Sequence, residues 1–219
     1  VNYKEALELQ KIWQIKKSKV LVGHLYLYNP AYQKLKKLFK RIRKMKSIHF
    51  VYLSSPIRKD ISVIWDWGPH PISMLLDLIK QPPVEVTAFG SIKNPQSKLL
   101  DTANVSIKFN NDIEASIHIS WQGFRRVRRL TVEAENGRIE FDDTNTANQK
   151  ILFSKPNTPP HYPKYKPGLA LTEELKEFAK AIKDSNNITS DINMGVSVVK
   201  VLFAIEQSVK NNGKLIKLG

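Results

Sequence analysis

The sequence predicts an α/β (α+β) fold in which helices pack on one face of a mostly antiparallel sheet. Two observations support this fold class. The middle of the chain alternates apolar and polar residues, as half-buried strands do. The flanking segments repeat apolar residues every three or four positions, as amphipathic helices do. The chain has 219 residues, of which 42% are hydrophobic, so it can bury a sizeable core.

The N-terminal part is predicted to contain two helices and a short strand. Residues 3–15 repeat apolar residues at helical spacing, and residues 20–22 have the composition of a short buried strand. Asn29 can cap a helix that begins at Pro30, because its side-chain oxygen accepts from free amides and proline lacks the amide that would go unpaired. The basic run 34–46 is expected to continue this helix, with one apolar stripe toward the core and basic residues on the opposite face.

A third helix is predicted over residues 69–79, after a strand at 47–53 and a polar loop at 54–62. Prolines flank its second residue and fit only in the first turn, so the helix begins close to residue 69. Its apolar residues recur at the i, i+3, i+4, i+7 spacing of a face that packs on a core: Ile72, Leu75, Leu76 and Ile79.

The second half is predicted to form a sheet with one dry face. Residues 102–109 and 113–121 alternate apolar and polar side chains. Residues 130–134 and 139–141 do the same and are joined across an Asn-Gly turn at 136–137, a pair that tolerates the positive φ of a tight turn.

The C-terminal part is predicted to be a loop followed by two helices. Residues 154–168 are so rich in proline that we expect a long ordered loop or arm rather than a ladder or a helix. Thr172 is expected to cap a helix with an acidic first turn. Asp191 is expected to cap the last helix, which is apolar nearly all round and should be deeply buried.

The chain is basic, with 35 Lys and Arg against 20 Asp and Glu. The run 34–46 and the arginines at 125, 126, 128 and 129 could contact phosphates. Neither cluster carries the interleaved exposed aromatics of a single-strand platform, so solvated faces are favoured over nucleic-acid binding.

Composition narrows the chemistry and the location. Without cysteine there is no disulfide framework, no thiolate chemistry and no thiolate metal ligand, and we predict no bound metal. No membrane span and no signal peptide are expected, so the predicted location is cytoplasmic.

Asp66 and His70 are the candidates for acid–base chemistry. They stand four residues apart at the mouth of the helix 69–79. At about 100° per residue, His70 falls about 200° from Ile72 and away from the apolar stripe, so we expect it outside the packed core. A helix N-terminus favours a neutral imidazole, which would keep His70 available as a base. The alternative makes Asp66 a helix cap and His70 a surface residue.

Three segments resemble a known family. Residues 22–32, Val-Gly-His-Leu-Tyr-Leu-Tyr-Asn-Pro-Ala-Tyr, resemble the VGHxxRFNPAY signature of the Gfo/Idh/MocA oxidoreductases, the glucose-fructose oxidoreductase and inositol dehydrogenase family. Residues 66–70, Asp-Trp-Gly-Pro-His, resemble its D-x-G-x-H motif. The closing helices are similar through Leu175, Phe178, Ile182, Ser190, Asp191, Gly195, Ala204, Ser208 and Gly213.

The resemblance implies a domain organisation. Residues 1–24 would be the last helix and strand of a truncated dinucleotide-binding Rossmann domain. Residues 25–219 would be a C-terminal substrate-binding and oligomerisation domain, built on a large open sheet. We therefore expect a homo-oligomer that forms through the open sheet face.

The resemblance also implies an activity. Members oxidise a hydroxyl of a sugar, sugar derivative or cyclitol, or reduce the matching ketone, with NAD or NADP. His70 would exchange the hydroxyl proton, while Asp66 would position the substrate or tune the histidine. The other site positions are three candidate substrate contacts and one candidate cofactor contact: Tyr28, Asn29 and Trp67, and His24.

Parts of the family pattern are missing. The nine glycines include no G-x-G-x-x-G, and the lysine of the family's E-K-P motif is absent, so we expect the isolated chain to be inactive. Leu27, Tyr28 and Ser73 replace the usual Arg, Phe and Asp, which leaves the substrate open. Two alternatives remain: a non-catalytic sugar-binding or oligomerisation module, and a basic nucleic-acid-binding protein.

Overall fold

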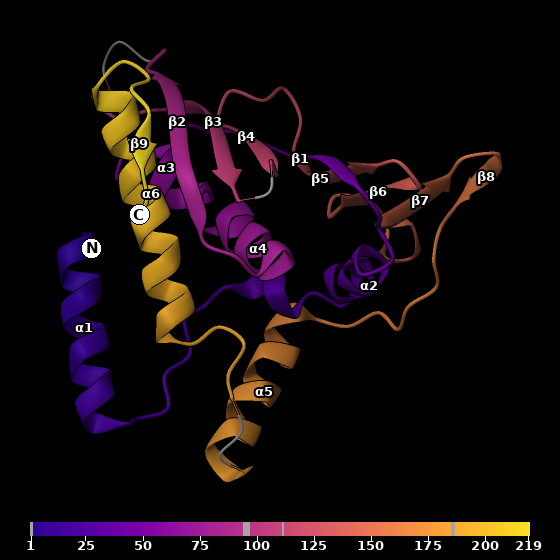
Figure 1. Ribbon diagram of the computed structural model, residues 1–219, viewed down its shortest axis with the longest axis horizontal. Coiled ribbons are helices and arrows are strands. Elements are labelled where there is room, and N and C mark those ends of the chain that lie inside the picture. Colours follow the sequence, from indigo (N-terminus) through magenta and orange to yellow (C-terminus); the bar gives the residue numbers. More distant parts are fainter. Residues whose placement is uncertain (1, 94–96, 111, 185–186) are drawn as a thin grey trace.

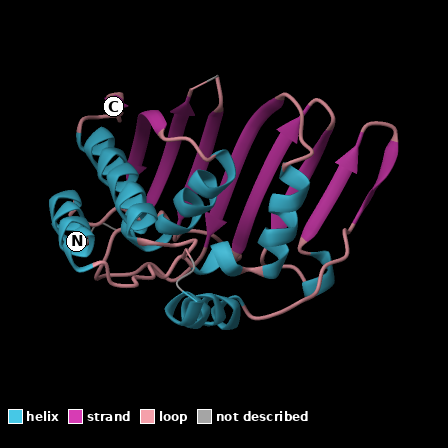
Figure 2. Cartoon of the chain, turned by 60° about the horizontal axis from the view of Figure 1, so that its bottom comes forward, coloured by secondary structure: helices cyan, strands magenta, loops and turns pink. Residues whose placement is uncertain are grey.

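The protein is built on one nine-stranded sheet whose helices gather on a single face (Figures 1 and 2). The computed structural model describes residues 2–93, 97–110, 112–184 and 187–219. The strand order is β8-β7-β6-β5-β1-β4-β3-β2-β9. Only β1 and β4 pair in parallel among these neighbours, so the predicted open, mostly antiparallel sheet is confirmed.

The strands vary from two to nine residues in length. Their bounds are β1 Met45–Leu53, β2 Pro83–Ser91, β3 Thr102–Phe109, β4 Glu114–Ser120, β5 Val127–Ala134, β6 Gly137–Asp142, β7 Ile151–Lys155, β8 Thr158–His161 and β9 Ile216–Lys217. The helices are α1 Tyr3–Lys16, η1 Leu25–Tyr28, α2 Pro30–Phe39, α3 Val63–Trp67, α4 Pro69–Ile79, η2 Ala147–Gln149, α5 Ala170–Asp184 and α6 Ile192–Lys210.

The central strand β1 shows why the helices cover one face only. Ile48, Phe50 and Tyr52 are buried beneath the helices, while the residues between them point to the other side. On that other side the exposed His49 ring binds the Ser116 hydroxyl of β4 through Nδ1 at 2.7 Å. Period-two alternation therefore gives the sheet one apolar, covered face and one open, polar face.

The predicted antiparallel hairpins are confirmed. Leu130 lies opposite Phe141 and Val132 opposite Ile139, across the turn at Gly137. Strands β3 and β4 pair antiparallel along their whole length.

The last helix is a core helix. Asp191 caps α6 by accepting from the Met194 amide at 2.9 Å, as predicted. By length and composition alone α6 could cross a membrane, but half of its apolar window is buried inside this fold, where it packs on β2, α1 and α4. An apolar helix at the centre of a globular domain has the same composition.

Two predictions about the N-terminal part are wrong. Residues 20–22 are extended but pair with no described strand, and Val22 instead exchanges bonds with Ser190 ahead of α6. The basic helix ends at Phe39 rather than continuing to Lys46. The chain turns there because Asn136 accepts from the Arg43 amide and donates to the Arg41 carbonyl, both at 2.9 Å.

Two predictions about the C-terminal part also need correction. The proline-rich segment was expected to hold no ladder, yet Phe153 pairs with His161 in the hairpin β7–β8. This is possible because β8 is the sheet edge, where a missing amide donor costs little. Thr172 does not cap α5, which begins two residues earlier, at Ala170.

Candidate functional site

His70 is the second residue of α4, and a glycine fixes its position. Gly68 joins α3 to α4 with helical backbone. A Cβ on Gly68 would lie 2.3 Å from the Ile64 carbonyl oxygen and 2.7 Å from Leu202 Cδ2. Only glycine therefore lets this junction approach α6, and the junction holds Asp66, Trp67 and His70 on consecutive turns.

Aromatic rings from three other elements gather around His70. The ring of Tyr26, from η1, lies 5.2 Å from the imidazole centroid, and the ring of Trp67 lies 6.1 Å from it. Tyr52, at the end of β1, contacts Tyr26 and Trp67 at 5.8 and 6.1 Å. We call Tyr26, Tyr52, Trp67 and His70, with the arginine described next, the aromatic cluster.

Arg128 closes the aromatic cluster from β5. Its side chain is 1% exposed, and its guanidinium carbon lies 3.3 Å from the centroid of the Trp67 ring. One terminal nitrogen, Nη1, donates to the Leu53 and Val127 carbonyls at 2.6 Å each, while Nε has no partner among the described residues. Burial lowers the pKa of Arg128 to about 10, so it is still a cation at neutral pH.

Arg128 is the site residue that the sequence argument misplaced. It was grouped with exposed arginines that could contact phosphates, and for Arg128 that grouping is wrong. The signal was present in the period of two, because Arg128 shares parity with Leu130 and Val132 on the covered face of β5.

Three influences set the charge of His70. Burial lowers its pKa below the ordinary value, Asp66 raises it and Arg128 lowers it further, with a net lowering. The imidazole is therefore neutral at pH 7. The side of α4 that was predicted to be open is in fact covered, since Met74 and Asp77 are 0% and 1% exposed, and His70 itself is half-buried.

Asp66 lies next to His70 but is bonded elsewhere. Its carboxylate accepts from Arg58 Nη1 at 2.8 Å and from Trp121 Nε1 at 3.3 Å. Among the described residues no hydrogen bond joins Asp66 to His70, so its influence on the imidazole is through charge. The alternative role of helix cap is not observed, because the α4 N-cap is Gly68.

His24 is a second histidine at the site. It is 6% exposed at the start of η1, and its Nε2 has no hydrogen-bond partner among the described residues. Burial first, and then the charge of His70, lowers the pKa of His24 to about 4. The contact of His24 with a cofactor stays a prediction.

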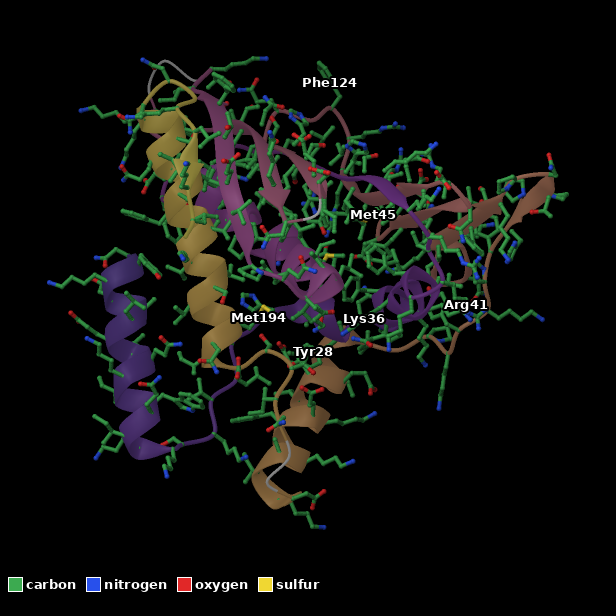
Figure 3. The ribbon with its side chains drawn as sticks, viewed as in Figure 1. Tyr28, Lys36, Arg41, Met45, Phe124 and Met194 are labelled. Carbon is green, nitrogen blue, oxygen red and sulfur yellow. The ribbon has the colours of Figure 1, made fainter. Side chains whose placement is uncertain are left out.

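Tyr28 and Asn29 are placed outside the aromatic cluster. The Tyr28 hydroxyl donates to Glu177 of α5 at 3.2 Å, and Figure 3 shows Tyr28 at the upper end of that helix. The Asn29 side chain caps α2 through the Ala31 amide and donates to Asp143 at 3.0 Å. Their roles as substrate contacts stay predictions, and Tyr26, which the sequence argument did not select, lies closer to His70.

Neither a metal nor a dinucleotide fits these residues. In the described part of the chain no three His, Asp or Glu side chains gather as a metal site. The described residues ahead of η1 form one helix and an extended segment, with no glycine-rich turn that could hold a pyrophosphate.

Solved structures share the fold. A putative oxidoreductase from Magnetospirillum magnetotacticum is 25% identical with a TM-score of 0.81, covering 93% of this chain and 68% of its own. UDP-N-acetylglucosamine 3-dehydrogenase from Acidithiobacillus ferrooxidans is 21% identical with a TM-score of 0.85, covering 96% and 68%. An inositol dehydrogenase homolog from Azotobacter vinelandii, complexed with NADH and myo-inositol, is 16% identical with a TM-score of 0.86, covering 99% and 69%.

The sequence comparisons point the same way. No curated protein matches the chain. Residues 54–140, which include α3, α4 and the strands β2 to β5, match the family model described as GFO/IDH/MocA C-terminal domain. The resemblance drawn from the motifs is confirmed: residues 54–140 match the model of the GFO/IDH/MocA C-terminal domain, and a solved oxidoreductase shares the fold over 93% of the chain.

Proposed function

We propose that His70 is the proton carrier of an NAD(P)-dependent oxidoreductase that acts on a hydroxyl or ketone of a sugar, sugar derivative or cyclitol. The observation that carries this proposal is the neutral, half-buried imidazole of His70, held among aromatic rings between a carboxylate and a buried cation. A neutral imidazole can accept the proton of a substrate hydroxyl, and can return it in the reverse direction.

The two neighbouring charges act in opposite directions on the protonation of His70. Arg128 disfavours a second cation beside it, so His70 is free to accept at pH 7. Asp66 favours the imidazolium once the proton has moved, because its carboxylate is held by Arg58 and Trp121 at a fixed position. Removal of the Arg128 charge and removal of the Asp66 charge should therefore shift the pH dependence of proton transfer in opposite directions.

The substrate class rests on the site and on the relatives together. Rings such as Tyr26 and Trp67 offer apolar faces with polar edges, which suit the alternating C–H and hydroxyl surface of a sugar or cyclitol. The named relatives include a UDP-N-acetylglucosamine 3-dehydrogenase and a homolog complexed with myo-inositol. Nicotinamide would supply or take the hydride. It would be bound by residues other than these.

We further propose that residues 1–24 belong to a dinucleotide-binding domain and residues 25–219 to the substrate domain. On α1, Leu9, Ile12 and Ile15 are 53%, 55% and 79% exposed, an apolar row that a further domain would cover. About a third of the length of each solved structure lies outside the part that matches this chain. The reading frame upstream of Val1 should encode a strand, a glycine-rich turn and an E-K-P motif, and a frame without them would contradict this assignment.

The open sheet face is the proposed contact between subunits. Its side chains, such as His49 and His118, are polar and partly exposed, and no described helix covers them. Light scattering after size exclusion should give a mass of two or more subunits. A monomer at all concentrations would rule out this role.

The catalytic proposal is tested by His70→Ala in the protein expressed from its natural reading frame. Turnover should fall by roughly 10²–10⁴-fold, the usual contribution of a positioned acid–base group, with dinucleotide binding retained. His161→Ala is the matched control, because His161 is exposed on the edge strand β8, away from the aromatic cluster. Wild-type turnover in His70→Ala would remove this residue from the mechanism, and absent turnover in all proteins would favour a non-catalytic sugar-binding module.

A further inference from the structure

A basic groove lies between α2 and α5, on the other side of η1 from the aromatic cluster. The groove has a volume of about 1,100 Å³, and its third wall is the proline-rich segment 162–169. In Figure 1 this segment runs from β8 past α2 to the start of α5. Seven lysines line it: Lys34, Lys36, Lys37, Lys164, Lys166, Lys176 and Lys180.

Most of this positive charge is unopposed. Lys36 is bound to Asp77 at 2.8 Å and Lys176 to Glu173 at 2.8 Å. The other five lysines form no ion pair with a described residue. The second glutamate of the lining, Glu177, is already bonded to the Tyr28 hydroxyl and to the Thr189 amide and hydroxyl.

The lysines of the groove repel one another when no anion lies between them. Lys176 and Lys180 are four apart on α5, and like charges at this spacing destabilise a helix. Lys34 and Lys37 repeat the arrangement three apart on α2, facing the lysines of the segment 162–169 across the groove. An anion with several charges, lying between the three walls, would remove this repulsion.

We infer that this groove binds a small molecule with two or more phosphate groups. Its volume lies just above the usual range of about 300–1,000 Å³ for small-ligand sites, and its neutral donors, Gln33 and Thr172, suit phosphate oxygens. A concave groove with walls from three segments differs from the flat basic surface that would lie on a membrane or along a duplex. The inference does not depend on the role proposed for His70.

The test is titration calorimetry of the 219-residue chain with inorganic pyrophosphate at low ionic strength. The variant Lys37→Gln/Lys166→Gln/Lys180→Gln removes one exposed lysine from each wall. Its Kd should be weaker by about tenfold or more, since each close charge pair contributes on the order of 1 kcal/mol in water. The control Lys46→Gln/Lys59→Gln/Lys108→Gln removes the same charge at exposed positions outside the groove and should bind like the wild type.

Further titrations separate the possible ligands. Equal affinity for pyrophosphate and ADP would support recognition of the phosphates alone, and tighter binding of ADP would support the site with an added contact to the nucleoside. No binding of pyrophosphate, or equal loss in both variants, would overturn the inference. Tighter binding of duplex DNA than of pyrophosphate, lost in the groove variant, would also overturn it in favour of a nucleic-acid surface.

Discussion

Arg128 and the lysines of the basic groove carry the same charge in opposite surroundings. Arg128 is buried beside Trp67, and its burial lowers its pKa to about 10. Lys37, Lys166 and Lys180 are exposed to solvent. A buried cation changes the protonation of its neighbours and holds buried backbone carbonyls, whereas an exposed cation is screened and can act on a ligand.

Asp77 connects these two regions. It is a 1% exposed residue of α4, the helix that carries His70, and it accepts from Lys36, a lysine of the groove, at 2.8 Å. It also accepts from Tyr32 at 2.8 Å and from Lys80 at 2.6 Å. The groove wall α2 is thus fixed to the helix of the catalytic candidate by a buried ion pair.

The comparison predicts the largest loss of stability for Arg128→Ala. This change leaves the Leu53 and Val127 carbonyls without their donor and removes the group that packs on Trp67. The free energy of unfolding should fall by about 2–4 kcal/mol, as for a cavity with unpaired polar groups. Urea unfolding measures it, with Arg126→Ala as an exposed control expected within about 0.5 kcal/mol. Equal effects of the two changes would show that Arg128 is not structural.

A smaller loss is expected for Asp77→Asn. Burial would raise the pKa of Asp77, but hydrogen bonds from Lys36, Lys80 and Tyr32 lower it below 3.8 overall. A lowered carboxyl pKa contributes stability that is present above pH 3.8 and is lost as the pH falls through the folded value. The variant should be less stable by about 1–3 kcal/mol at pH 7, with a weaker pH dependence below pH 4. Unfolding curves from pH 7 to pH 2 measure the stability and its pH dependence. An unchanged stability would show that the ion pair between α2 and α4 does not stabilise the fold.

The smallest effect on stability is expected for Lys37→Gln/Lys166→Gln/Lys180→Gln. These side chains are exposed and have no ion pair with a described residue, so the free energy of unfolding should change by less than about 0.5 kcal/mol for each position. Thermal unfolding without ligand is the measurement. A large loss would mean that the groove lysines hold the fold, as Arg128 does.

The fold class, the helix caps and the hairpin turn could be predicted from the sequence. The cap at Asn29, the cap at Asp191 and the turn at Gly137 are set by neighbouring residues, and all three are observed. The end of α2 was missed because Asn136, nearly a hundred positions away, binds the backbone at Arg41. Local patterns therefore predict an element but not the tertiary contact that ends it.

The candidate site was predicted only in part. Asp66, Trp67 and His70 belong to one short segment, so their proximity follows from the helix junction at Gly68. Arg128 comes from a strand that is distant in sequence, so its parity with Leu130 indicates the covered face but not the contact with Trp67. The proline-rich strand β8 was missed because the sequence does not show which strand lies at the edge of the sheet.

The central claim is that burial and Arg128 keep His70 neutral while Asp66 opposes them. An NMR titration of the histidine Cε1–H signals tests it most directly, with His70 assigned through His70→Gln. We expect a wild-type midpoint below pH 6.5, an increase in Arg128→Gln and a further decrease in Asp66→Asn. A wild-type midpoint at or above 6.5, or one that neither substitution moves, would contradict it.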